Sequence, residues 1–157
     1  MTFCNAYGDF GATGIPSCFG SVGESPYSGV ISLFIKALST GESPIVLGDG
    51  KQTRDFTYIA NVVDGVLRAC HAPNASGHVI NVATNGRISL NALFQEMKKI
   101  VGATVEPIYA PPRQGDVKDS QADITKAADL LGYKPIVSFE DGLKRTIDWY
   151  KAAHVTL

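Results

Sequence analysis

The sequence predicts a domain of the α/β class, and three observations indicate it. From residue 29 onward, segments with apolar residues at helical spacing alternate with short runs of β-branched and aromatic residues. The chain has 157 residues, of which 45 % are hydrophobic and 18 % charged, which is the length and composition of a globular domain with its own core. No internal repeat and no second domain boundary interrupts the alternation.

The first part of the alternation contains two predicted helices. Residues 29–41 carry apolar side chains at helical spacing and end in a glycine, which favours a helix closed by a left-handed cap. Residues 43–50 and 53–59 predict strands separated by a Gly-Asp-Gly turn. Residues 62–70 predict the second helix, and Asn61 is expected to cap it.

The second part predicts three more helices, each preceded by a residue of a capping type. The helices are expected over residues 90–102, 124–132 and 139–153, with Ser89, Asp123 and Ser138 as their caps. Two strands are expected between helices, over residues 78–82 and 104–110. A proline interrupts the second of these strands, which favours the edge of a sheet.

Residues 8–26 differ from the rest of the chain. They hold five glycines and two prolines and show no periodic apolar face. A loop of this length in a compact domain is usually functional or poorly ordered. We therefore separate residues 1–25, an N-terminal strand with a long glycine-rich loop, from residues 26–157.

Composition excludes several classes of partner. The net charge is −1, so no basic excess points to nucleic acid or to an anionic membrane surface. No apolar run has the length of a membrane span, and the first residues lack the pattern of a signal peptide. The three cysteines are far apart and the three histidines are scattered, which predicts neither disulfides nor a metal site. A cytoplasmic location is expected.

The stretch APPRQGDVKDSQAD, residues 110–123, is the first candidate site. A guanidinium presents a fork of donors that matches phosphate oxygens in pairs, and two prolines stiffen the loop before Arg113. Asp116 adds a carboxylate, which accepts hydrogen bonds from sugar hydroxyls. The two side chains could therefore bind the diphosphate and the ribose of one nucleotide. The alternative is an exposed Arg–Asp ion pair that contributes little to stability.

The stretch GDGKQTRDF, residues 48–56, is the second candidate. Arg54 begins a predicted strand after a flexible turn, where an arginine can reach a ligand over the end of a sheet. The alternative is an ordinary hairpin with Arg54 and Asp55 on its rim. Asn5, in TFCNAYG, is a third candidate, because its amide could bind a polar ligand or simply begin a turn.

Several catalytic signatures are missing. No lysine stands four residues after any tyrosine, and no glycine-rich dinucleotide turn directly joins a predicted strand to a predicted helix. Neither a nucleophile elbow nor a P-loop is present. The sequence therefore offers no catalytic residue.

These motifs occur in a recognisable order. The stretches are PYSGVISLFIKAL, GESPIVLGDGKQTRDFTYIANVVDGVLRA, GHVINVATNGRISLNALFQEMKKIVG and PIYAPPRQGDVKDSQADITKAADLLGYKPIVSFEDGLKRTIDWY. Together they closely resemble the C-terminal, substrate-binding part of the NAD-dependent sugar-nucleotide epimerase/dehydratase family. These proteins are extended short-chain dehydrogenases, and UDP-glucose 4-epimerase is a familiar member. The resemblance implies a small α/β C-terminal domain without the NAD-binding Rossmann half.

The resemblance also implies roles for residues of the two arginine motifs. Arg54 matches the arginine of the RDF motif, and Arg113 matches the arginine of the PxRxGD motif. Both would hold the diphosphate of the substrate. Asp116 matches the aspartate of the second motif and would lie beside the ribose.

Further site residues are implied nearer the N-terminus. Tyr27, Val30 and Ile31 fall in the segment that would form a wall for the nucleobase. Asn5 would touch the sugar-phosphate end of the substrate. Residues 1–25 diverge from the family pattern, whereas residues 26–157 follow it as the sugar-nucleotide-binding domain.

The family's NAD-binding half supplies the hydride carrier and a Tyr-x-x-x-Lys pair, and neither is matched here. We therefore expect a domain that binds a nucleoside diphosphate sugar, a UDP-sugar above all, with no catalysis and no cofactor of its own. Its protein partner would be a separate NAD-binding chain or a second copy of itself. The alternative is a non-catalytic, self-associating or interaction protein derived from such a domain.

Overall fold

The structure is a computed structural model that describes residues 2–3, 18–19 and 29–154. The described helices are α1 (Val30–Thr40), α2 (Ile59–His71), α3 (Leu90–Val101), α4 (Thr125–Leu131) and α5 (Phe139–His154). The described strands are β1 (Thr2–Phe3), β2 (Cys18–Phe19), β3 (Ile45–Leu47), β4 (Thr53–Arg54), β5 (Thr57–Tyr58), β6 (Val79–Ile80), β7 (Ile88–Ser89) and β8 (Ile108–Ala110). No helix among these residues is both long and apolar enough to cross a membrane.

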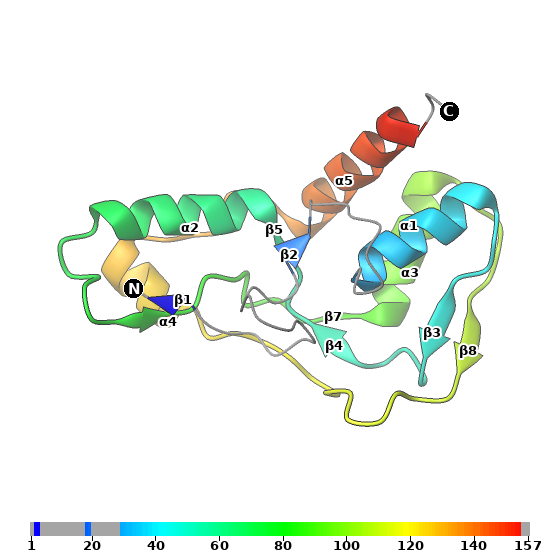
Figure 1. The fold of residues 1–157 in the computed structure, drawn as a ribbon, viewed down its shortest axis with the longest axis horizontal. Coiled ribbons are helices and arrows are strands. Elements are labelled where there is room, and N and C mark those ends of the chain that lie inside the picture. The colour runs from blue at the N-terminus through cyan, green and yellow to red at the C-terminus, as the bar shows by residue number, and fades with distance from the viewer. Residues whose placement is uncertain (1, 4–17, 20–28, 155–157) are drawn as a thin grey trace.

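The described strands join in pairs. β1–β6, β2–β5 and β3–β8 are parallel, whereas β4–β7 is antiparallel. Figure 1 shows α2, α4 and the β1–β6 pair at one end of the molecule, and α1, α3 and the β3–β8 pair at the other, with β4 and β7 between them. This mixed architecture confirms the predicted α/β class.

The larger core lies between α1, α3 and α5. The rings of Phe34 and Phe94 meet edge to face, with their centroids 6.3 Å apart. Leu143 and Ile147 of α5 are fully buried in the same cluster. The residues that form the predicted apolar stripe of α1 are thus the ones that face this core.

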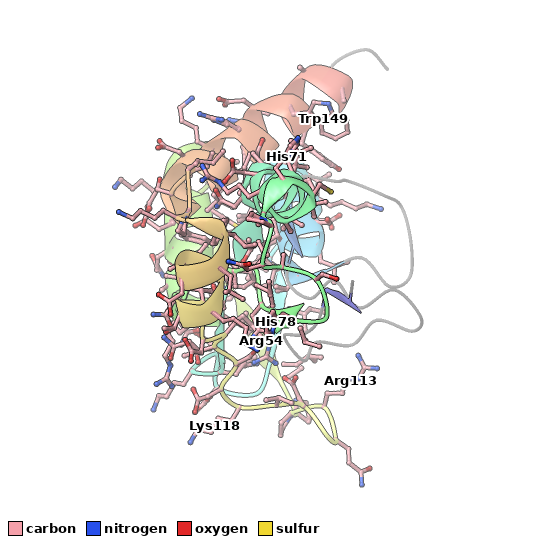
Figure 2. All side chains as sticks on the ribbon, turned by 90° about the vertical axis from the view of Figure 1, so that its left-hand side faces the viewer. Arg54, His71, His78, Arg113, Lys118 and Trp149 are labelled. Atoms are coloured by element: carbon pink, nitrogen blue, oxygen red, sulfur yellow. The ribbon has the colours of Figure 1, made fainter. Side chains whose placement is uncertain are left out.

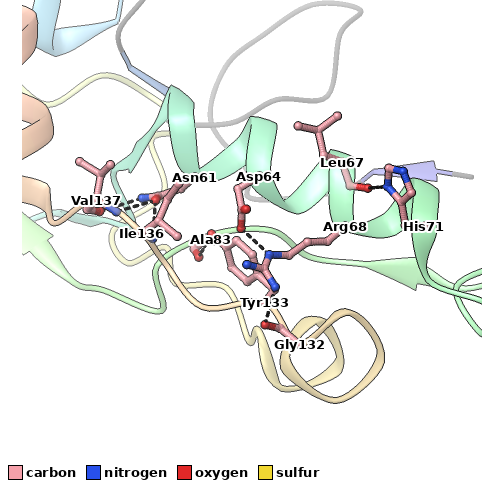
Figure 3. A network of polar contacts seen from close by, with 10 residues as sticks. All are labelled: Asn61, Asp64, Leu67, Arg68, His71, Ala83, Gly132, Tyr133, Ile136 and Val137. Atoms are coloured by element: carbon pink, nitrogen blue, oxygen red, sulfur yellow. Dashed lines mark hydrogen bonds and ion pairs between the residues drawn. The ribbon is translucent and has the colours of Figure 1, made fainter.

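A smaller core joins α2 to α4 (Figure 3). Tyr133 is fully buried, and its hydroxyl donates to the backbone oxygen of Ala83 over 2.9 Å. Burial raises the pKa of Tyr133 to about 12. Arg68 of α2 bonds the carboxylate of Asp64 and the backbone oxygen of Gly132, so it ties α2 to the end of α4.

The predicted cap at Asn61 is wrong. The helix α2 begins at Ile59, and Asn61 is completely buried in its first turn. The Asn61 amide oxygen accepts the backbone N–H groups of Ile136 and Val137, over 2.8 and 2.9 Å, and its NH₂ group donates to the Val137 oxygen over 2.9 Å. Asn61 therefore holds a distant segment (Figure 3) instead of its own helix end.

The caps at Ser89 and Ser138 confirm the prediction. Their side-chain oxygens accept the backbone N–H groups of Ala92 in α3 and Asp141 in α5, each over 3.1 Å. The helix α4 differs, because Ile124 stands at its cap position and Asp123, one residue earlier, accepts the N–H of Thr125 over 2.9 Å. Gly41 and Gly102 close α1 and α3 in the left-handed conformation, with φ of 73° and 79°.

The expected strand over residues 53–59 is divided. β4 pairs with β7, a short strand that the sequence pattern missed, while β5 pairs with β2. The chain changes partner at Asp55 and Phe56, whose side chains are both buried. Alternation of side chains alone could not reveal this change, because each short strand satisfies the same pattern.

Candidate functional site

The first candidate site is a loop that begins with a tight turn. β8 ends at Ala110, and the backbone N–H of Asp116 donates to the backbone oxygen of Arg113 over 3.2 Å. Gly115 stands third in this turn with φ of 81°, the left-handed backbone that a type II turn requires at that position. Arg113 and Asp116 therefore occupy the two ends of one turn. We call residues 110–118 the clamp loop.

The clamp loop is anchored at both of its ends. At its start, β8 pairs with β3, and the Gly48 N–H donates to the Ala110 oxygen over 2.9 Å. At its end, the Thr53 N–H donates to the Lys118 oxygen over 2.8 Å, and the Ser120 N–H donates to the Thr53 oxygen over 3.1 Å. The turn thus extends from two fixed points of the fold.

Arg54 meets the clamp loop from β4. Its Nη2 donates to Asp116 Oδ1 over 2.6 Å, and its Nη1 donates to the Thr53 backbone oxygen over 2.8 Å. The Arg54 side chain is 14 % exposed and that of Asp116 is 37 % exposed. A guanidinium carries five N–H donors, so these two bonds leave others for a ligand. The structure therefore brings the two candidate stretches together.

Arg113 and Lys118 lie farther out than Arg54. Both are exposed, and Figure 2 shows them at the end of the molecule that the clamp loop forms, with Arg54 set back toward the body. This end of the molecule therefore carries three cations and the carboxylate of Asp116, which Arg54 bonds, and such a combination favours an anionic ligand with hydroxyl groups.

An open pocket of about 800 Å³ lies beside the clamp loop. Its polar side is lined by Arg113, Asp116 and Lys118, and its apolar side by Leu47 and Tyr109. The parallel strands β3 and β8 both end at this pocket, which is the edge of a parallel sheet where ligands commonly bind. The pocket therefore combines cationic side chains with an apolar surface.

A second pair of contacts holds the end of the clamp loop. Asp119 accepts from the Thr53 hydroxyl over 2.7 Å and from Arg87 Nη2 over 2.8 Å. These hydrogen bonds, that from Thr53 above all, hold the pKa of Asp119 below its ordinary value. The sequence pattern did not identify Asp119 or Arg87, because their contact links residues far apart in the chain.

Asp55 is the second residue that the sequence interpretation misplaced. The hairpin alternative put it on a rim, but its side chain is 1 % exposed. Its carboxylate accepts hydrogen bonds from Thr84 and from the Ala122 backbone. No signal in the sequence distinguishes this buried aspartate from an exposed one next to an arginine.

The remaining predicted residues lie near α1 or outside the described residues. Asn5 and Tyr27 are outside them. Val30 is half-buried at the start of α1, and Ile31 is 5 % exposed within the larger core. The Ile31 side chain therefore packs inside the larger core. No cluster of metal-binding side chains occurs in the described part of the chain.

Comparison with known proteins identifies the family. The sequence profile of the family described as GDP-mannose 4,6 dehydratase matches residues 2–146. The chain belongs to this family. Its relatives include NAD-dependent sugar-nucleotide epimerases of the extended short-chain dehydrogenase type, which confirms the resemblance seen in the sequence.

Three members of the family illustrate the relationship. UDP-glucose 4-epimerase of Mycolicibacterium smegmatis is 36 % identical over 124 residues, which cover 79 % of this chain and 39 % of the relative. The structure of UDP-glucose 4-epimerase from Thermotoga maritima with UDP-glucose is 37 % identical, with a TM-score of 0.80, and the match covers 87 % of this chain and 44 % of that one. The structure of UDP-glucuronic acid 4-epimerase from Bacillus cereus with UDP-glucuronic acid and NAD is 31 % identical, with a TM-score of 0.80 and coverage of 88 % and 44 %.

This member of the dehydratase family spans less than half the length of these relatives. The matched region is their C-terminal part. Full-length relatives hold NAD, as the Bacillus cereus complex does. The relationship therefore agrees with the expectation that these residues correspond to the part outside the NAD-binding half.

Proposed function

We propose that this chain binds the nucleotide diphosphate of a UDP-sugar, with Arg54 and Arg113 as the diphosphate ligands. The observation that supports the proposal is the hydrogen bond from Arg54 Nη2 to Asp116 Oδ1, because it brings Arg54 of β4 against the short turn that begins at Arg113. Two guanidinium groups around one turn suit an anion with several oxygens, such as a diphosphate.

Asp116 is proposed to bind the ribose. A carboxylate can accept about four hydrogen bonds, so the bond from Arg54 leaves acceptor positions for sugar hydroxyls. The same carboxylate would repel a phosphate, which favours a ligand that places its hydroxyls here and its phosphates toward Arg113. A nucleoside diphosphate has this order of groups.

The apolar side of the pocket supports the choice of a nucleotide. Leu47 and Tyr109 line it, and both are large side chains exposed by more than two fifths in this chain. A flat base can cover such surface, whereas a free phosphate or a simple sugar would leave it in water. Val30 and Ile31 are the first two residues of α1, so their N–H groups have no acceptor within the helix, and they are the proposed polar contacts of the base.

We assign no catalytic step to these residues. None of the 157 residues supplies a Tyr-x-x-x-Lys pair. Hydride chemistry would have to come from an NAD-binding half. The proposed activity of this chain is therefore binding and orientation of the sugar nucleotide.

The test is a thermal-shift titration with UDP, UDP-glucose and dTDP-glucose, with Arg113→Ala as the control variant. A ligand at about 100 times its Kd stabilises a protein by roughly 2.7 kcal/mol. For a domain of this size that free energy corresponds to a rise in Tm of roughly 5–10 °C. We expect a saturable rise in the unmodified chain that is lost in the Arg113→Ala variant. No shift at millimolar UDP-sugar would contradict the proposal.

One observation favours a second candidate, an interaction function. Val63 and Leu67 stand one turn apart on α2 with 48 % and 56 % of their surface exposed. Such a stripe on a helix can bind a second copy of the chain or a separate NAD-binding chain. Sedimentation of the chain and of a Leu67→Glu variant separates self-association from binding of another chain. Self-association predicts a mass that rises with concentration in the unmodified chain and stays that of a monomer in the variant.

A further inference from the structure

Asp55 is buried directly behind the proposed diphosphate site. Its Oδ1 accepts the backbone N–H of Thr84 over 3.2 Å and also the Thr84 hydroxyl, while its Oδ2 accepts the backbone N–H of Ala122 over 3.2 Å. A carboxylate that is 1 % exposed needs such donors to replace its lost hydration. Through these bonds Asp55 joins three segments that are distant in the sequence.

The first consequence concerns Arg54, the residue before it. Arg54 is the last residue of β4, and Asp55 follows it directly. Thr84 and Ala122 fix the Asp55 side chain inside the protein, while the Arg54 side chain meets Asp116 of the turn. The bonds of Asp55 thus hold the backbone from which the Arg54 guanidinium extends.

The second consequence concerns the clamp loop. Ala122 lies just after the segment that pairs with β4 through the bonds of Thr53 to Lys118 and Ser120. The bond from Asp55 to Ala122 extends this attachment by two residues beyond Ser120. The same carboxylate therefore fixes the end of the clamp loop and the strand that carries Arg54.

We infer that Asp55 is a positioning residue for the diphosphate site, which sets Arg54 and the turn at residues 113–116 relative to each other. This inference rests on the proposed function, because it assigns a role toward the same ligand. Asp55 is not placed in contact with that ligand and acts through Arg54. Thr84 and Ala122 are the groups through which it acts.

The main test compares Asp55→Asn with a matched pair at Thr84. In Asp55→Asn, an NH₂ group replaces one of the two carboxylate oxygens that accept N–H groups of Thr84 and Ala122. Two donors then face each other, so one hydrogen bond is lost with little change in side-chain shape. Thr84→Val removes the hydroxyl donor, whereas Thr84→Ser keeps it. We expect UDP affinity, measured by calorimetry, to fall about tenfold or more in Asp55→Asn and clearly in Thr84→Val, and to stay unchanged in Thr84→Ser.

Two readouts separate positioning from a general loss of structure. The affinity for uridine should fall less than the affinity for UDP in Asp55→Asn and Thr84→Val, because uridine can meet Asp116 of the turn but has no phosphate for Arg54 and Arg113 to bind. In an Arg54→Ala background, Asp55→Asn should cause no further loss of UDP affinity, because the group that it positions is gone. Equal losses for uridine and UDP, or fully additive losses in the double variant, would overturn the inference. If Asp55→Asn does not fold, the Thr84 pair carries the test.

The result for the unmodified chain distinguishes the two proposals. If it binds UDP and Asp55→Asn binds equally well, the proposed function stands and the positioning role is wrong. If it does not bind UDP, the proposed function is wrong, and amide hydrogen exchange decides the inference. Faster exchange at Arg54 and Asp116 in Asp55→Asn, with Leu93 of α3 unchanged, would support positioning, and unchanged exchange at those two amides would overturn it.

Discussion

Arg54 and Asp116 are 62 residues apart in the sequence, and Nη2 of the first lies 2.6 Å from Oδ1 of the second. The pair is only partly exposed, and the arginine also bonds its neighbouring backbone oxygen. This geometry needs a planar group with several donors. A lysine has the same charge, but its single ammonium cannot reproduce the fork.

Arg54→Lys is therefore expected to weaken UDP binding about tenfold or more, with a change in the free energy of unfolding below about 1 kcal/mol. Calorimetry and urea unfolding measure the two quantities. Arg145→Lys on α5, an exposed position that packs over Tyr58, is the matched control and should bind UDP normally. Equal affinity in both variants would argue against a role of Arg54 in the site.

Gly50→Ala should destabilise the chain more than Gly41→Ala. Both glycines have left-handed backbone, with φ of 70° and 73°, so both substitutions carry the same conformational strain. A Cβ at Gly41 meets nothing within 4 Å, whereas one at Gly50 would lie 2.0 Å from the Asn91 side-chain oxygen, which also accepts the Tyr109 hydroxyl. Urea unfolding should show an extra loss of about 1–3 kcal/mol for Gly50→Ala. Equal losses would mean that the Asn91 side chain moves aside freely.

Asn61→Ala should be among the most destabilising single changes in the smaller core. It removes three hydrogen bonds and leaves the backbone groups of Ile136 and of the buried Val137 without their partner. We expect a loss of about 2–4 kcal/mol in the free energy of unfolding. The exposed Asn74→Ala should stay within about 0.5 kcal/mol of the unmodified chain. A small effect at Asn61 would show that water replaces its bonds.

Stability at alkaline pH should depend on Tyr133. Its pKa is raised to about 12 in the folded chain, so the folded state keeps the proton more tightly than the unfolded state does. The resulting stabilisation is complete below about pH 10 and is lost as the pH rises toward 12. Tyr133→Phe cannot titrate, so it should lose less stability between these two pH values, although it starts lower because the bond to Ala83 is gone. Parallel pH profiles for the two proteins would refute this.

Stability at acid pH should depend on Asp119. Hydrogen bonds from Thr53 and Arg87 lower its pKa in the folded chain, so its contribution is present above the ordinary carboxyl range. That contribution disappears as the pH falls through the lowered pKa. Asp119→Asn should therefore lose less stability than the unmodified chain on acidification below about pH 4. Asp129→Asn, at an exposed site on α4, serves as the control in the same urea series.

Local chemistry predicted the helices and most of their ends. Ser89, Ser138 and Gly102 act within a turn of their own position, so residue type and spacing sufficed. Asn61 also has a side chain that can cap a helix, but it is buried and bonds the backbone near Ile136 instead. Local sequence holds no information about that segment.

The candidate site shows the same division. Arg54, Arg113 and Asp116 could be selected from residue chemistry and from the family resemblance, but the pairing of Arg54 with Asp116 is a tertiary contact. The hairpin alternative put Asp55 on a rim with Arg54, but contacts with Thr84 and Ala122 bury it. Asp55 lies where the chain passes from the pairing of β4 with β7 to the pairing of β5 with β2. Nothing in the residue types around Asp55 indicates that it is buried there.

The attachment of the clamp loop at both ends has a consequence for how specificity can change in this family. The clamp loop is held at its start by pairing of β8 with β3 and at its end by the bond of Thr53 to Lys118. The residues between these two attachments can therefore change without moving either one. If the proposed function holds, substitutions and even insertions at residues 111–117 are expected to alter ligand preference, while the two attachments keep their register. An insertion at residues 118–120 would instead displace β4 and Arg54 with it, because these residues bond Thr53. Changes that affect ligand preference and changes that affect folding are therefore expected only a few residues apart in the sequence.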